Sequence, residues 1–209
     1  KQGTNIVDIE FENNYSNDGN GLHSFVDTDG LQYLYSNCEP YRANQMLPCF
    51  DQPDLKGSLK LTVAAPKSWS IISHTAATEG VQHEAFKNNK IIKHLDGSKT
   101  KCLSFDSTQK ISSYLFTIVA GPYVEIKAKE LYQGIPMSLY SRASLNNFLK
   151  EQAEEIFEIT RANMKFYEDF FGYPYPFSKY DQIFCPEYNM GAMENPGCVT
   201  LNDLYIFKE

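Results

Sequence analysis

One short stretch near the end of the chain combines small residues with a single carboxylate. Residues 191–195 read Gly-Ala-Met-Glu-Asn, and the flanking segments 180–185 and 198–201 have the composition of short strands. The two small residues leave the backbone uncovered, so an extended peptide could pair with it as an added strand. Glu194 would then lie beside the end of that peptide, where a carboxylate can bind a free ammonium group through charge-assisted hydrogen bonds.

The stretch also carries a resemblance. Gly-Ala-Met-Glu-Asn is similar to the exopeptidase signature of the zinc aminopeptidase N family, the gluzincin aminopeptidases, and residues 187–190 and 197–200 resemble the same family. Two further blocks, in residues 38–56 and 111–121, also resemble it. Three blocks in the family's order over most of the chain identify it as resembling the later part of the N-terminal domain and the opening of the catalytic domain.

The resemblance implies a set of residues that bind a peptide substrate with a free N-terminus. Glu194 and Glu39 would both bind the α-amino group and are expected to face the same small space. Met190 would form the floor of the first side-chain pocket, although an ordinary core methionine is an equally good interpretation. Asn37 stands where the family usually has glutamine, so its contact with substrate depends on a shorter amide arm. The complete implied set is Asn37, Glu39, Met190, Gly191, Ala192, Met193 and Glu194.

The zinc motif of the family is not found in this sequence. Family catalysis uses H-E-x-x-H on a helix and a later glutamate to bind zinc and activate water. The four histidines, His23, His74, His83 and His94, lack i, i+4 spacing and are expected to be ordinary surface or strand residues. The resemblance therefore implies zinc in the full-length protein, none bound by this chain, and an inactive 209-residue piece of a metallo-aminopeptidase.

Two alternatives remain open. One is a non-catalytic, aminopeptidase-like scaffold used for binding; both glutamates argue against it, because a scaffold needs no amine-binding carboxylates. The other is a bifunctional relative resembling leukotriene hydrolase, which usually has Gly-Gly in the signature, so Ala192 disfavours it.

Composition narrows the classes of partner. The net charge of −7 argues against nucleic acid or an anionic membrane, and no apolar run reaches the length of a membrane span. The five cysteines form no C-x-x-C pair, which favours free thiols and a reducing, cytoplasmic setting.

The periodicity predicts an α+β fold. Residues 5–141 read as successive antiparallel strands without strand–helix–strand alternation. The predicted strands are residues 31–36, 59–63, 69–74, 91–95, 101–105, 114–120, 124–128, 180–185 and 198–201. Residues 144–171 have helical spacing, with Ser144 as the cap, Gly172 at the end and a buried aromatic face. We predict a mainly antiparallel β domain over residues 1–143, lacking the family's first strands, and the start of a thermolysin-like catalytic domain over 144–209.

Overall fold

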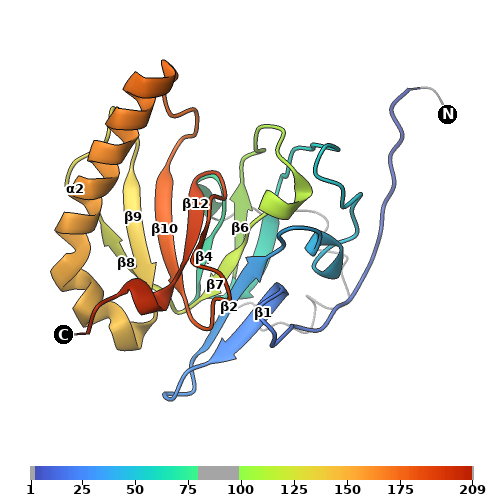
Figure 1. Ribbon diagram of the computed structural model, residues 1–209. Helices are drawn as coiled ribbons and strands as arrows, with labels where there is room; N and C mark the ends of the chain where they lie inside the picture. Colours follow the sequence, from blue (N-terminus) through green and yellow to red (C-terminus); the bar gives the residue numbers. More distant parts are fainter. Residues whose placement is uncertain (1–2, 80–98, 209) are drawn as a thin grey trace.

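The computed structural model of the chain describes residues 3–79 and 99–208, and Figure 1 shows its ribbon. Within these residues the chain forms three β-sheets and one long α-helix. Two antiparallel sheets come from the first part of the chain, and a five-stranded sheet carries the helix on one face. The predicted α+β class is confirmed.

The elements follow one another with short connections. The strands are β1 (Gly21–Val26), β2 (Gln32–Asn37), β3 (Thr62–Pro66), β4 (Ser70–Ile72), β5 (Ala77–Glu79), β6 (Thr100–Phe105), β7 (Val119–Gly121), β8 (Val124–Lys127), β9 (Met137–Ser141), β10 (Tyr180–Cys185), β11 (Ala192–Met193) and β12 (Cys198–Asn202). The helix is α2 (Asn146–Phe171), and the short 3-10 turns are η1 (Ala43–Gln45), η3 (Ser113–Leu115), η4 (Ala143–Leu145) and η5 (Asp203–Tyr205).

The four-stranded sheet is the middle layer of the molecule. Its order is β1-β2-β7-β4, and each neighbouring pair is antiparallel. Side chains alternate along β2, so Tyr33 and Tyr35 point to one face and Leu34 points to the other. The tyrosines pack with Ile183 of the five-stranded sheet, whereas Leu34 packs with Leu103 of the three-stranded sheet β3-β6-β5.

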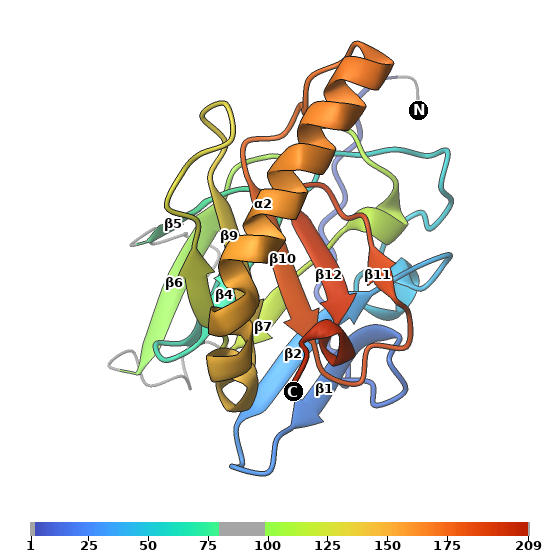
Figure 2. The same ribbon diagram turned by 60° about the vertical axis from the view of Figure 1, so that its left-hand side comes forward.

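The five-stranded sheet is mixed, with the order β11-β12-β10-β9-β8. β10 pairs in parallel with both β9 and β12, and the two edge strands pair antiparallel. Parallel neighbours need a crossover connection, and α2 provides it between β9 and β10 (Figure 2). Leu149, Ala153, Phe157 and Met164 recur at near-helical spacing and form the buried face of α2.

The expectation that residues 5–141 contain no part of a strand–helix–strand unit is wrong. β9 lies in that range and is the first strand of such a unit. Its Met137 and Leu139 pack beneath α2, but Ser138 and Ser141 are buried as well, so the strand lacks a simple apolar pattern. Because β8 and β9 join the same sheet as β10, the pairing favours a domain boundary before β8. The division at residue 143 stays a prediction.

Other strand boundaries also differ from the predictions. Residues 114–120 are not one strand: η3 occupies the start, and only β7 pairs in the sheet. The predicted strand 59–63 begins late, because only residues from Thr62 onward join the ladder with β6. The predicted strand 91–95 lies outside the described residues.

The two ends of α2 are formed differently. Gly172 ends the helix in the left-handed conformation (φ +62°), as predicted. Ser144 is not the cap: Leu145 occupies that position without a side-chain hydrogen bond. The Ser144 hydroxyl instead donates to Asp27 Oδ2 over 2.8 Å or less, at 2.7 Å. A tertiary carboxylate has therefore replaced the helix backbone as its partner.

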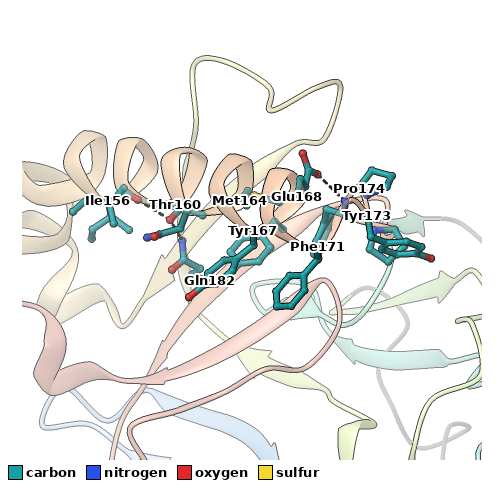
Figure 3. A pocket seen from close by; sticks show the side chains of 14 residues that line it. Ile156, Thr160, Met164, Tyr167, Glu168, Phe171, Tyr173, Pro174 and Gln182 are labelled. Atoms are coloured by element: carbon teal, nitrogen blue, oxygen red, sulfur yellow. Dashed lines mark hydrogen bonds between the residues drawn. The ribbon is translucent and has the colours of Figure 1, made fainter.

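The aromatic face of α2 is not buried as predicted. Tyr167 and Phe171 are 54% and 69% exposed. They line a groove of about 620 Å³ between the end of α2 and Gln182 on β10 (Figure 3). The last turns of α2 extend past the strands in Figure 1, so no sheet lies beneath them. Among the described residues, no helix is long and apolar enough to cross a membrane.

Arg142 joins the layers through two buried carboxylates. Its Nη1 donates to Asp27 Oδ2 at 2.8 Å, and its Nε donates to Asp203 Oδ2 at 2.9 Å. Asp27 follows β1, whereas Asp203 follows β12. The guanidinium therefore fastens the β1–β2 hairpin to the five-stranded sheet.

The first prediction concerns this junction. Arg142→Ala leaves both buried carboxylates without their cation, and the free energy of unfolding should fall by about 3–5 kcal/mol. Urea denaturation at neutral pH measures the loss. Arg142→Lys keeps the charge but not the planar arrangement of donors, so it should lie between the two. A loss below about 1 kcal/mol for Arg142→Ala contradicts the role assigned to this side chain.

The second prediction compares two phenylalanines on α2. Phe157 is 2% exposed and Phe170 is 70% exposed. Phe157→Ala should destabilise the fold by about 3–5 kcal/mol, because it removes contacts and leaves a cavity. Phe170→Ala should change stability by less than about 0.5 kcal/mol. Equal losses in thermal unfolding would show that the exposed end of α2 is packed against other parts of the protein.

Candidate functional site

The predicted site lies on the connection between β10 and β12. β11 pairs only with β12, through Ala192–Leu201 and Met193–Thr200, and is the edge of its sheet. Met193 points inward and is 4% exposed, whereas Ala192 and Glu194 are exposed. Alternation along this edge therefore leaves a small side chain and a carboxylate facing outward on either side of a buried anchor.

Gly191 lies where a larger side chain does not fit. Its carbonyl accepts the amide of Asn202 at 3.0 Å, which aligns the start of β11. A Cβ at Gly191 would lie 2.7 Å from the hydroxyl oxygen of Tyr205. Met190 is half-buried and packs against the core between the sheets. The structure thus supports its interpretation as a packing residue and leaves the pocket role a prediction.

Asn37 connects the site to the four-stranded sheet. Its Nδ2 donates to Asn189 Oδ1 at 2.8 Å and to the carbonyl of Gly19 at 2.9 Å. Its Oδ1 is buried without a hydrogen-bond partner. Glu39 follows two residues later and is half-buried. The end of β2 and the loop before β11, far apart in sequence, therefore meet at Asn37 and Asn189.

His23 and Tyr35 add two contacts to the same loop that sequence reasoning did not find. The amide of Gly19 donates to His23 Nδ1 at 3.0 Å, so the neutral ring carries its proton on Nε2. That nitrogen lies 3.2 Å from Glu187 Oε2. The Tyr35 hydroxyl donates to the carbonyl of Glu187 at 3.0 Å. Both residues are in strands, and their pairing with a distant loop leaves no local sequence signal.

Polar side chains within the loop fix the backbone on the far side of Glu194. Asn195 is buried, and its Nδ2 donates to Thr200 Oγ1 at 3.1 Å. The Tyr188 hydroxyl lies 2.7 Å from the same oxygen. Glu194 is therefore an exposed carboxylate between two buried neighbours, Met193 and Asn195.

The turn after Asn195 is bound by side chains from two other segments. His74 Nδ1 donates to the carbonyl of Pro196 at 2.7 Å, and Lys179 Nζ donates to that of Gly197 at 2.8 Å. Burial lowers the pKa of His74 below its ordinary value of 6.5. Burial also raises the pKa of Asp181, whose carboxylate lies 2.5 Å from Lys179 Nζ and partly offsets the rise through that charge.

The described residues do not fit a zinc site. Among residues 3–79 and 99–208, no group of three histidine, cysteine, aspartate or glutamate side chains could hold a metal ion. His23 and His74 use both ring nitrogens in other contacts. His83 and His94 lie outside the described residues. The five cysteines are free thiols, of which Cys38, Cys185 and Cys198 are buried.

Comparison with known proteins gives the family. The family described as Peptidase M1 N-terminal domain matches residues 1–115, and that described as Peptidase family M1 domain matches residues 155–209. The chain belongs to the M1 peptidase family. The predicted family resemblance is therefore confirmed over both parts of the chain.

Three relatives indicate how much of an M1 protein this chain represents. Aminopeptidase N of Streptomyces lividans is 38% identical over 209 residues, which are 99% of this chain and 22% of that protein. Tricorn protease-interacting factor F2 of Thermoplasma acidophilum is 29% identical over 95% of the chain and 22% of its own length. Leucyl aminopeptidase of Saccharolobus solfataricus is 28% identical over 95% and 23%. The chain spans between a fifth and a quarter of these relatives.

The third prediction follows from the buried, neutral His74. Because its pKa is lowered by burial, the unfolded chain binds more protons than the folded chain at pH values below 6.5. Stability should therefore fall as the pH drops through 6.5 toward the folded-state pKa, and this contribution should be constant above that range. Urea denaturation between pH 5 and about pH 8 measures the slope.

His74→Gln is the matched control for that slope. The amide offers one donor and one acceptor in place of the two ring nitrogens and does not titrate in this range. The difference in stability between wild type and variant should narrow on acidification. A difference that is constant over the whole pH range contradicts the neutral state assigned to His74.

Proposed function

We propose that this chain provides the substrate-recognition part of a zinc-dependent aminopeptidase that removes N-terminal residues from peptides. The observation that carries the proposal is the open edge at β11, which ends in the exposed Glu194 and is tied through Asn189 to the segment before Glu39. The family and its aminopeptidase relatives support the same reaction class.

The edge of β11 suits the backbone of an extended peptide. Its partner β12 occupies one side, and nothing in the described chain pairs with the other. Ala192 projects only a methyl group, so a substrate backbone can approach closely and pair as an added strand. Gly191, confined by the Tyr205 hydroxyl, begins the edge without a side chain of its own.

Two carboxylates then recognise the free amine. An ammonium has three donors, and one carboxylate in a cleft rarely satisfies all of them. We assign Glu194 and Glu39 to this group together, so that a peptide with a blocked, uncharged N-terminus leaves both carboxylates without a cation. Discrimination arises because desolvating an unpaired carboxylate is unfavourable.

Zinc belongs to the same proposal but not to these side chains. The described residues contain no suitable ligand cluster, so we assign the metal to other residues of the full-length protein. Bound zinc would supply an activated water for peptide hydrolysis. The part of the reaction given to this chain is to bind and orient the peptide, and the cytoplasmic setting stays a prediction.

The fourth prediction tests Glu194 in the full-length enzyme. Glu194→Ala should lower kcat/KM for a free-amine peptide by at least about tenfold, because a charge-assisted contact worth about 1–3 kcal/mol is lost. The N-acetylated peptide lacks that contact, so its kcat/KM should change much less. Initial rates on the two peptides give the ratio directly.

Glu158→Ala is the control, because Glu158 is an exposed glutamate on α2 and lies outside the predicted site. It should leave both rates at the wild-type value. A Glu194→Ala enzyme with the wild-type ratio contradicts amine recognition by this residue. Absence of peptidase activity in the zinc-loaded wild type favours the non-catalytic scaffold instead.

A further inference from the structure

The turn that follows Glu194 is bound more firmly than a surface turn requires. The carbonyls of Pro196 and Gly197 accept hydrogen bonds from His74 and Lys179, which come from different parts of the fold. His74 follows β4 in the four-stranded sheet, and Lys179 immediately precedes β10. Two consecutive carbonyls are therefore fixed from two sides, one or two residues from the site.

His74 is itself rigidly mounted. The amide of Thr117 donates to its Nε2 at 3.0 Å, which places the ring proton on Nδ1, where it is donated to Pro196. The adjacent Ser73 hydroxyl donates to the carbonyl of Thr117 at 2.7 Å. The ring is 4% exposed. Its position therefore follows that of the four-stranded sheet.

Lys179 is equally constrained from the other side. Its ammonium is buried, paired with Asp181 and bonded to the Gly197 carbonyl. The Tyr175 hydroxyl accepts the amide of Gly197 at 3.2 Å and donates to the carbonyl of Lys179 at 3.1 Å. Glu168, near the end of α2, accepts the amide of Tyr175 at 2.7 Å (Figure 3). Both backbone polar groups of Gly197 are thus bound.

Gly197 leaves no space between the turn and His74. Its φ is +69°, a conformation that favours glycine. A Cβ there would collide with the carbonyl oxygen of His74. The turn is therefore in direct contact with the backbone of the four-stranded sheet as well as with the imidazole.

We propose that His74 and Lys179 are positioning residues for amine recognition. They fix the path of residues 195–197 and thereby the place of the Glu194 carboxylate at the end of β11. Neither touches the substrate; each acts through a main-chain carbonyl. The inference rests on the proposed function of Glu194, and it adds that the four-stranded sheet sets the selectivity of a site on another sheet.

The experiment measures kcat and KM of the full-length enzyme on a free-amine peptide and its N-acetylated form. His74→Ala should raise KM for the free-amine peptide about tenfold, the loss expected for a displaced charge-assisted contact, with kcat changed less than about threefold. His74→Gln can bind Thr117 and Pro196 with one amide and should restore KM to within about threefold. His74→Asn keeps a polar amide on a shorter arm and should resemble alanine, which preserves the test if the alanine variant does not fold.

Leu103→Ala is the matched control for lost stability. Leu103 is buried in the three-stranded sheet, so its truncation destabilises the protein without reaching the turn. It should leave the ratio of free-amine to acetylated activity unchanged. If Leu103→Ala lowers the ratio as much as His74→Ala does, the His74 effect is general destabilisation and the inference is wrong.

Failure of the inference and failure of the proposed function are distinguishable. A wild-type enzyme that prefers the free amine, with His74→Ala and His74→Asn showing the wild-type KM, overturns the positioning role alone. A wild-type enzyme that cleaves both peptides equally overturns amine recognition and the positioning role together. A raised KM that glutamine restores supports both.

Discussion

Buried carbonyl groups need donors, and the turn at residues 195–197 places two of them below the surface. A buried acceptor left unpaired costs about 1–3 kcal/mol, so the turn is stable only where donors reach it. His74 and Lys179 supply them from opposite sides. The arrangement of the four-stranded sheet, the segment before β10 and the end of α2 all converge on this one requirement. Glu194 takes its place from it.

The part of the fold predicted from the sequence is the part in which local pattern and tertiary environment agree. The helix over residues 144–171 is such a case, because its apolar spacing and Gly172 are both local signals. Pattern records which residues are apolar but not what covers them, so it wrongly buried Tyr167 and Phe171. It also did not reveal β9, whose buried serines bond to neighbouring groups instead of following an apolar alternation.

The candidate site divides in the same way. Residues 191–195 form a contiguous word, and their exposed edge could be predicted from residue type and resemblance. The contacts that shape that word could not, because His23, His74 and Lys179 bind main-chain or side-chain atoms of a loop distant in sequence or space. Each is an isolated polar residue in its own segment. Only the folded chain shows that three such residues serve one loop.

The shortness of β11 has a consequence for solubility. An open sheet edge that accepts a peptide also offers unpaired amides and carbonyls to strands of other proteins, which is how edges seed aggregation. β11 has two residues, is followed by the charged Glu194, and bends into the turn at Pro196. A long foreign strand therefore finds too few partners to remain bound, whereas a short peptide needs no more than these. The same brevity that limits the register of a substrate keeps this edge from polymerising.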